Sequence, residues 1–220
     1  AQQVSVFTSD LVQPQLVSFE LDMNNGLLYL TFSETVNATS FDVTQLVIQS
    51  GRLSDLNRAR RLMSESRIVP QVGYTTVIND RVIIVHLGPA DLNRLKATES
   101  IARGVYDTWL NLSNYLVQDM NTNQVVASTL QANYFIPDKT PPFILSFSVN
   151  LILNQITLSF NEPINATTVN FNAITLQDNV TAQNNHTLTG GNITKYNDSL
   201  TLILTFNAYD TDILKMQAKL

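Results

Sequence analysis

The 220-residue chain contains no cysteine, only two histidines, seven glycines and seven prolines, and few charged residues. The lack of cysteine excludes disulfides, thiol catalysis and thiolate metal sites. The sequence has neither a glycine-rich phosphate loop nor a G-x-S-x-G nucleophile motif. No stretch approaches the length of a membrane-spanning apolar helix, and residues 1–10 lack the basic start and apolar block of a signal peptide.

What the chain does have is a composition suited to a buried core. Hydrophobic residues make up 44% and charged residues 14%, far from the composition of a disordered chain. The length fits one large domain or two small ones. A net charge of −5 gives no electrostatic reason to expect nucleic acid or an anionic membrane surface as a partner.

The chain also repeats itself. Residues 14–49 align with residues 142–177 without a gap, and ten of the 36 positions are identical. The two copies share "FSETVNAT" (32–39) and "FNEPINAT" (160–167), at a spacing of 128 residues. After a length change, residues 79–96 match residues 197–215 and pair Asp91 with Asp210, Leu95 with Leu214 and Lys96 with Lys215. The sequence therefore predicts a tandem repeat.

The repeat predicts the domain boundaries. The complete unit spans residues 14–138, and the second unit spans 139–220 and reaches only the counterpart of Ile101. Residues 1–13 resemble the tail of a preceding unit, because "FTSDLVQP" (7–14) echoes "FIPDKTPP" (135–142). The chain thus reads as a piece of a longer array.

The predicted elements are mostly strands. Apolar residues alternate with polar ones in 16–22, 27–32, 46–49, 81–87 and 104–113, and turn residues such as Asn25-Gly26 separate the segments. Copy two repeats the pattern in 143–149, 155–160, 173–177 and 199–206. One short helix is expected at 90–98, with Asp91 as its N-cap. Many short strands at this spacing predict an all-β fold of tandem immunoglobulin-like β-sandwiches.

The repeated motif resembles that of a known group. "FSETVNATSFDVTQLVIQ" and "FNEPINATTVNFNAITLQ" are similar to the signature of bacterial-type Ig-like repeats, and "DKTPPFILSF" (138–147) is similar to their inter-domain entry. Such repeats occur in S-layer proteins, adhesins and large surface proteins of microbial eukaryotes. The resemblance implies a structural or adhesive repeat and carries over no catalytic residue.

The sequence offers seven acceptor triplets for N-linked glycans. Two of them fall at the same place in the two repeats, where aspartate would serve the turn equally well. They indicate an extracellular glycoprotein, while ordinary turn-rich loops are the alternative. The candidate acceptors are Asn37, Asn111, Asn165, Asn179, Asn185, Asn192 and Asn197.

Catalysis is not expected. His86 lies in an apolar strand and His186 in a triplet, neither with a nucleophile or base pattern nearby. One carboxylate per repeat, Glu34 and Glu162, is not an acid–base pair. No cofactor is predicted. Calcium would need several carboxylates to converge, whereas turn and helix caps explain them more simply; the carboxylates considered are Glu34, Asp80, Asp91, Asp119 and Asp138.

An insertion in copy one, residues 50–67, is rich in arginine. It is either a solvated loop or a contact surface for an acidic subunit or an anionic glycan. Its arginines are Arg52, Arg58, Arg60, Arg61 and Arg67.

Three functions remain open. The sequence favours a structural segment of a long extracellular glycoprotein, forming a cell-surface rod, filament, flagellar hair or coat together with neighbouring domains and other copies. The alternatives are an adhesin that recognises a glycan or surface protein, and a non-catalytic accessory region of a large secreted enzyme. An adhesin would expose an aromatic or acidic loop cluster, but Tyr106 and Trp109 are expected to pack inside their strand.

Overall fold

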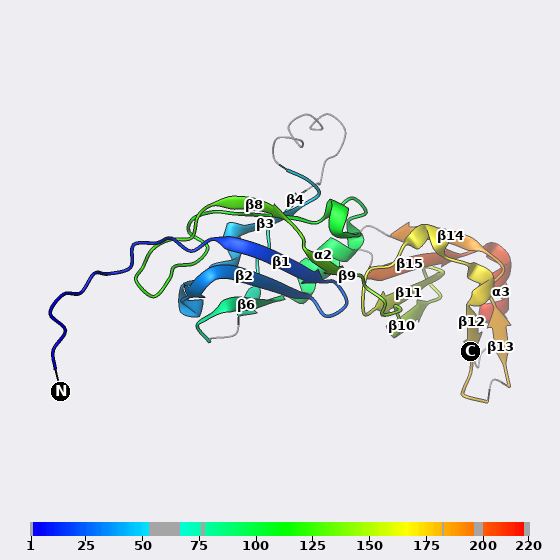
Figure 1. Cartoon of the computed structure of the whole chain (residues 1–220). Helices are drawn as coiled ribbons and strands as arrows, with labels where there is room; N and C mark the ends of the chain where they lie inside the picture. Colours follow the sequence, from blue (N-terminus) through cyan, green and yellow to red (C-terminus); the bar gives the residue numbers. More distant parts are fainter. Residues whose placement is uncertain (1, 53–66, 76–77, 182, 196–199, 218–220) are drawn as a thin grey trace. The chain divides into compact units, whose positions relative to one another are not determined.

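The computed structural model describes residues 2–52, 67–75, 78–181, 183–195 and 200–217. They fall into two compact units, residues 1–140 and 141–220, and the division lies within the "DKTPP" segment. Figure 1 shows the strands of both. Each unit is described by itself.

The first unit contains a five-stranded sheet in the order β5-β6-β2-β1-β9. Strands β1 and β2 form an antiparallel hairpin, and Asp22 stabilises its turn: the Asp22 Oδ1 atom accepts hydrogen bonds from the backbone N–H groups of Asn24 and Asn25. Gly26 completes the turn with a positive φ of 68°. Strand β9 pairs parallel to β1. The strands are β1 (Leu16–Asp22), β2 (Leu27–Val36), β5 (Gly73–Thr75), β6 (Asp80–Leu87) and β9 (Tyr134–Ile136).

A four-stranded sheet in the order β4-β3-β7-β8 lies opposite. It consists of β3 (Leu46–Gln49), β4 (Arg67–Ile68), β7 (Trp109–Leu112) and β8 (Ser128–Gln131). Alternate side chains of both sheets meet in one buried cluster. Its fully buried members include Phe19, Leu30 and Phe32 from the first sheet, and Ile48 and Leu110 from the second. The predicted all-β sandwich is confirmed.

A short helix, α2 (Pro89–Ala97), follows β6. The helix was predicted, but Asp91 is not its N-cap, which is Gly88. The N-cap lies three residues earlier than expected, because Pro89 is preformed for the first helical position. Asp91 instead accepts hydrogen bonds from the backbone N–H groups of Gln71 and Val72 at 2.7 and 3.1 Å, and so fixes the neighbouring segment.

The predicted strand 104–113 is also shorter than expected. A 3₁₀ turn, η3 (Val105–Asp107), occupies its first part, and β7 begins only at Trp109. The Asp107 carboxylate accepts from the backbone N–H groups of Arg103 and Gly104, which closes the turn. This turn holds Tyr106 74% exposed, so the expectation that it packs inside was wrong. Trp109 is half-buried.

The second unit repeats the hairpin. Its main sheet runs β10-β11-β15-β14, with β12 and β13 forming a separate pair. Both hairpins carry a register shift at the same place, between Leu16 and Ser18 and between Ile144 and Ser146. The elements are β10 (Ile144–Asn150), β11 (Gln155–Phe160), β12 (Thr175–Gln177), β13 (Asn185–Thr187), β14 (Gly191–Lys195), β15 (Thr201–Phe206) and α3 (Ala208–Met216).

The cores of the two units differ in extent. In the second unit Ile156, Leu158, Leu202 and Leu204 are buried, but every residue of β10 is exposed, whereas β1 buries Leu16, Phe19 and Leu21. Neither helix of the described residues is long and apolar enough to cross a membrane.

The equivalent residues Phe32 and Phe160 should therefore contribute differently to the free energy of unfolding. Phe32 is fully buried, so Phe32→Ala should lower the free energy of unfolding by about 3–5 kcal/mol. Phe160→Ala should cost about 1–2 kcal/mol, because Phe160 is only half-buried. Urea unfolding measures both: the fluorescence of Trp109, the one tryptophan, reports the first unit, and far-ultraviolet circular dichroism reports the whole chain. Equal losses would contradict this difference in packing.

Candidate functional site

The Asn-Ala-Thr motif forms the same turn in both units. Asn37 precedes the 3₁₀ turn η1 (Ala38–Ser40), and Asn165 precedes η4 (Ala166–Thr168). Their backbone angles are nearly equal, φ −81° and ψ 101° against φ −82° and ψ 102°. The side-chain oxygen of Asn37 accepts from the backbone N–H and the hydroxyl of Thr39, at 3.1 and 2.7 Å. Asn165 accepts from Thr167 in the same way, at 3.0 and 2.6 Å.

The other residues of the motif have structural roles. Ala38 and Ala166 are buried, so a small side chain is required there. The hydroxyl groups of Ser40 and Thr168 donate to the backbone oxygens of the two asparagines. The predicted strand 27–32 is longer than expected: Phe32 is fully buried within β2, which continues to Val36, also buried, directly before Asn37. The repeated motif is thus a strand end followed by a capped turn.

A second turn shows what the cap requires. Asp42 precedes η2 (Val43–Gln45), and its Oδ1 accepts from the N–H and hydroxyl groups of Thr44 at 3.0 and 2.6 Å. The bond from the Thr44 hydroxyl holds the pKa of Asp42 below its usual value. Aspartate therefore makes the same cap as asparagine in this chain, and the cap alone does not explain the asparagines at 37 and 165.

Both asparagines use their amide oxygen in the turn. No hydrogen bond from either Nδ2 atom occurs among the described residues. Asn165 is exposed and Asn37 is half-buried. The arrangement leaves an amide nitrogen, beside an exposed threonine hydroxyl, open to modification.

The remaining acceptor triplets lie in different settings. Asn111 sits in β7, where its Nδ2 donates to the Thr129 hydroxyl at 2.9 Å. Asn179 makes the same Asx turn with Thr181 and is exposed. Asn185 in β13 and Asn192 in β14 are exposed, and Asn197 lies outside the described residues.

The arginine insertion is described only at its ends. Arg52 lies over the Trp109 ring, with its guanidinium carbon 5.2 Å from the ring centre. Arg67 is exposed in β4, opposite Gln49. Arg58, Arg60 and Arg61 lie outside the described residues, so the predicted partner contact stays a prediction.

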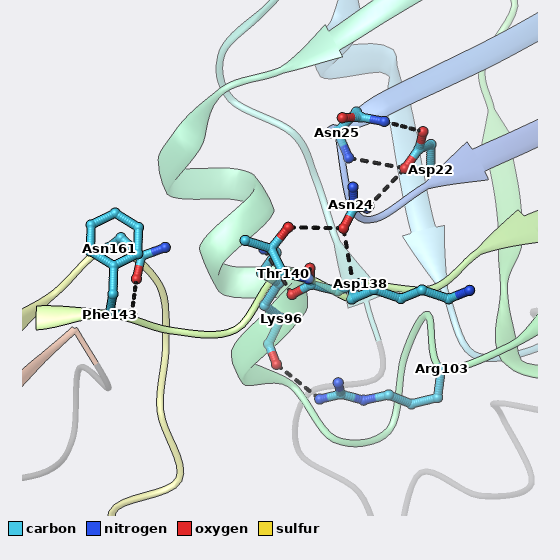
Figure 2. Close-up of polar contacts among 10 residues, drawn as sticks. Asp22, Asn24, Asn25, Lys96, Arg103, Asp138, Thr140, Phe143 and Asn161 are labelled. Atoms are coloured by element: carbon cyan, nitrogen blue, oxygen red, sulfur yellow. Dashed lines mark hydrogen bonds and ion pairs between the residues drawn. The ribbon is translucent and has the colours of Figure 1, made fainter.

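Of the carboxylates considered for calcium, the structure brings only two together. Glu34 and Asp119 lie with Asp10, which the sequence reasoning missed, and their oxygens are within 4.8 Å of one another. The Asp80 carboxylate accepts a hydrogen bond from the backbone N–H of Arg81. Asp91 holds the segment before β5 and pairs with Arg94. Asp138 pairs with Lys96 at 2.8 Å (Figure 2).

The carboxylates of Asp10, Glu34 and Asp119 repel one another when they are ionised. Burial, and then the charges of Asp10 and Asp119, raise the pKa of Glu34. Asp119 is 3% exposed and already accepts from the backbone N–H groups of Asn121 and Asn123 and from the Asn123 amide. The cluster supplies hard oxygen donors, but Ca²⁺ takes six to eight oxygens in all. The expectation that no calcium binds at these carboxylates stays a prediction.

One histidine has a partner that the sequence did not reveal. The Nε2 atom of His186 lies 2.9 Å from the Asp210 carboxylate, which is fully buried. Burial alone would raise the pKa of Asp210, but bonds from His186 and from Thr189 hold it below its usual value. The pair ties β13 to α3. His86 stacks on Tyr74, with ring centres 4.3 Å apart.

The second unit also has an open apolar groove of about 570 Å³. It lies between β10, β12 and the end of α3. Its walls are Phe147, Val149, Leu151, Thr175, Leu176, Gln177 and Leu214.

No protein-family model matches the chain, and no curated protein matches it significantly. Among solved structures it is similar to domains 1–6 of the surface layer protein SbsC, with 15% identity, a TM-score of 0.35, and coverage of 64% of this chain and 15% of that one. The N-terminal part of the bacterial S-layer protein SbsC gives 15% identity and the same TM-score, over 63% of this chain and 26% of that one. The S-layer protein rSbsC(31-844) gives 14% identity and a TM-score of 0.35, over 71% and 18%. Likeness at this level defines no family.

Two substitutions at Asn37 separate the role of its side-chain oxygen, which caps the turn, from the role of its amide nitrogen. Asn37→Ala should lower the free energy of unfolding by about 1 kcal/mol, because the Thr39 N–H loses its acceptor. Asn37→Asp should leave stability within about 0.5 kcal/mol, as Asp42 makes the same turn. Chemical denaturation followed by Trp109 fluorescence measures both. Equal losses from the two substitutions would show that the turn needs the amide itself.

The raised pKa of Glu34 predicts a pH effect. The folded state binds a proton more tightly than the unfolded state, so the ionisation of Glu34 reduces stability as pH rises above the ordinary glutamate pKa. Glu34→Gln should therefore stabilise the first unit at pH 7, by about 0.5 kcal/mol for this partly exposed site. The gain should vanish near pH 4, and denaturation curves across this range measure it.

The exposed Glu20 of β1 provides the matched control, as Glu20→Gln. A gain from Glu34→Gln that is the same at pH 4 and pH 7 would rule out the charge repulsion.

Proposed function

We propose that this chain is a structural segment of a long extracellular glycoprotein built from tandem β-sandwich units. The assembly would be a cell-surface rod, filament, flagellar hair or coat. The observation that carries the proposal is the glycan acceptor turn, which recurs with the same geometry at Asn37 and Asn165.

The comparison with Asp42 supports a role for the amide. Since aspartate caps an equivalent turn in the same chain, a structural requirement alone would accept either residue at 37 and 165. Both units have asparagine at this position, and in both the threonine hydroxyl donates a hydrogen bond to the side-chain oxygen of that asparagine. One glycan per unit at a fixed place would give a regular coat along an array.

Further glycans would protect an exposed strand. In the described sheet of the second unit, β14 is an edge strand, and its Asn192 is exposed. An unpaired strand edge invites pairing with other chains, and a bulky glycan prevents it. A polymer of β domains at high local concentration needs such protection. A catalytic role is not part of the proposal: we infer that the His186–Asp210 pair has a structural role between β13 and α3.

The adhesin alternative is favoured by one observation. Asp10, Glu34 and Asp119 form an acidic cluster in which Asp10 is exposed, Glu34 is half-buried and Asp119 is buried, and an adhesin was expected to have an acidic loop cluster. Binding to a glycan array that is lost in Glu34→Gln would favour the adhesin over the structural segment.

Site-specific glycopeptide mass spectrometry of the native protein tests the proposal. We expect hexose-bearing peptides at Asn37 and Asn165. Asn111 should be bare, because its Nδ2 is bonded to Thr129 within a strand. It serves as an internal control for triplets that lack the open turn. Bare asparagines at all seven triplets would overturn the glycoprotein proposal.

A further inference from the structure

The outward face of the five-stranded sheet in the first unit carries aromatic side chains in register. Strands β9, β1, β2 and β6 lie side by side in that order (Figure 1). Tyr134 of β9 is opposite Glu20 of β1, and Glu20 is opposite Tyr29 of β2. Tyr29 is in turn opposite Ile84 of β6. One row across the sheet is therefore tyrosine, glutamate, tyrosine and isoleucine.

This row points away from the core. The next residues along the same strands, such as Leu30 and Phe135, belong to the buried cluster or pack against it. Because successive side chains of a strand point to opposite faces, the row lies on the outer face of the sheet. Tyr134 is 55% exposed, Glu20 is exposed and Tyr29 is half-buried.

A second aromatic pair extends this surface. Tyr74 of the edge strand β5 is opposite His86, and His86 is opposite Leu27 of β2. The Tyr74 and His86 rings are stacked, with an angle of 7° between their planes, and Tyr74 is 68% exposed. Both rows lie on the same face, because Leu27 and Tyr29 are two residues apart in one strand.

The second unit shows that the fold does not require this face. Its hairpin has the same register, and Thr157 and Ser148 take the places of Tyr29 and Glu20. Small polar residues suit the solvent-facing side of an antiparallel sheet. An exposed group of aromatic residues on that side, in one unit only, marks an interaction surface.

The row has the chemistry of a sugar-binding surface. A tyrosine offers an apolar ring face and a hydroxyl, which suit the C–H face and the hydroxyl rim of a pyranose sugar. The Glu20 carboxylate, between the two rings, can accept hydrogen bonds from two neighbouring sugar hydroxyls. Among the described residues of the two rows there is no lysine or arginine, so the face favours a neutral glycan over an anionic one.

The spacing of the two tyrosines selects the kind of polymer. Neighbouring strands lie about 4.8 Å apart, so Tyr134 and Tyr29, two strands apart, are separated by about 10 Å. In an extended β-1,4-linked polymer each sugar is turned over relative to the one before it. The same ring face therefore recurs every second sugar, and a disaccharide repeat is close to the separation of the tyrosines in length.

We propose that the outer face of this sheet binds a neutral β-1,4-linked hexose polymer along Tyr134, Glu20 and Tyr29. The polymer crosses the strands, with alternate sugars on the two tyrosine rings and the sugar between them hydrogen-bonded to Glu20. Tyr74 and His86 border the bound polymer. The proposal goes beyond the structural function and does not depend on it: a segment with this face would also hold a polysaccharide layer.

Isothermal titration calorimetry of the full 220-residue chain with cellohexaose and chitohexaose tests the proposal. We expect at least one of them to bind with a dissociation constant on the order of 1 mM or lower. Polygalacturonate, an anionic polymer, should not bind, because the Glu20 carboxylate repels it.

Substitutions taken from the second unit suit this sheet. Tyr29→Thr and Glu20→Ser introduce the residues of the equivalent positions, and each should weaken sugar binding about tenfold or more. Tyr115→Thr and Glu99→Ser are the matched controls, since both residues are exposed and lie outside this sheet. They should change binding by less than about twofold. Urea unfolding verifies that each variant is folded.

The proposal is wrong if neither hexasaccharide binds at about 10 mM, if binding survives both Tyr29→Thr and Glu20→Ser, or if polygalacturonate binds more tightly. Sedimentation velocity tests the other occupant. Self-association that is lost in Tyr29→Thr would assign the face to a second copy of the chain and rule out the sugar. Each of these results leaves the structural function standing, because glycopeptide mass spectrometry at Asn37 and Asn165 tests that function separately.

Discussion

The structure depends on covering the apolar face and edge of one hairpin. In the first unit, the β1–β2 hairpin places Phe19, Leu30 and Phe32 against the second sheet, and β9 closes the edge of β1. Burial of apolar side chains such as these is the dominant favourable term in folding. The same hairpin in the second unit is open along β10, where Phe147 is exposed. Equivalent residues are therefore buried in the first unit and exposed in the described part of the second.

The capped turns follow from that hairpin. Once Phe32 is fixed in the core, the chain must leave the strand and turn within a few residues. Asn37 and Thr39 close this turn with two hydrogen bonds to one oxygen, and Asn165 and Thr167 do the same. A glycan acceptor that is part of a cap is presented at a fixed place, because its backbone is held by the core beneath it.

Sequence reasoning succeeded where local pattern decides structure. Alternation located β1, β3 and β11 to the residue, and the repeat placed equivalent strands and turns in both units. It failed at the ends of elements. Asp91 bonds a distant segment instead of capping α2, and the bonds to Asp107 turned the start of a predicted strand into η3, which exposes Tyr106. These outcomes depend on partners that no local pattern reveals.

By itself the sequence determined the strands of the two hairpins, their repetition and the Asn-Ala-Thr turns, because period-two patterning and Asx caps are local properties. It did not reveal short strands such as β5, β8 and β9. Only the tertiary structure decided which distant residues meet. It brought Asp10 to Glu34 and Asp119, His186 to Asp210, and Asp138 to Lys96. It also decided which strand covers the edge of β1: β9 pairs parallel to β1, although the two strands are far apart in the sequence.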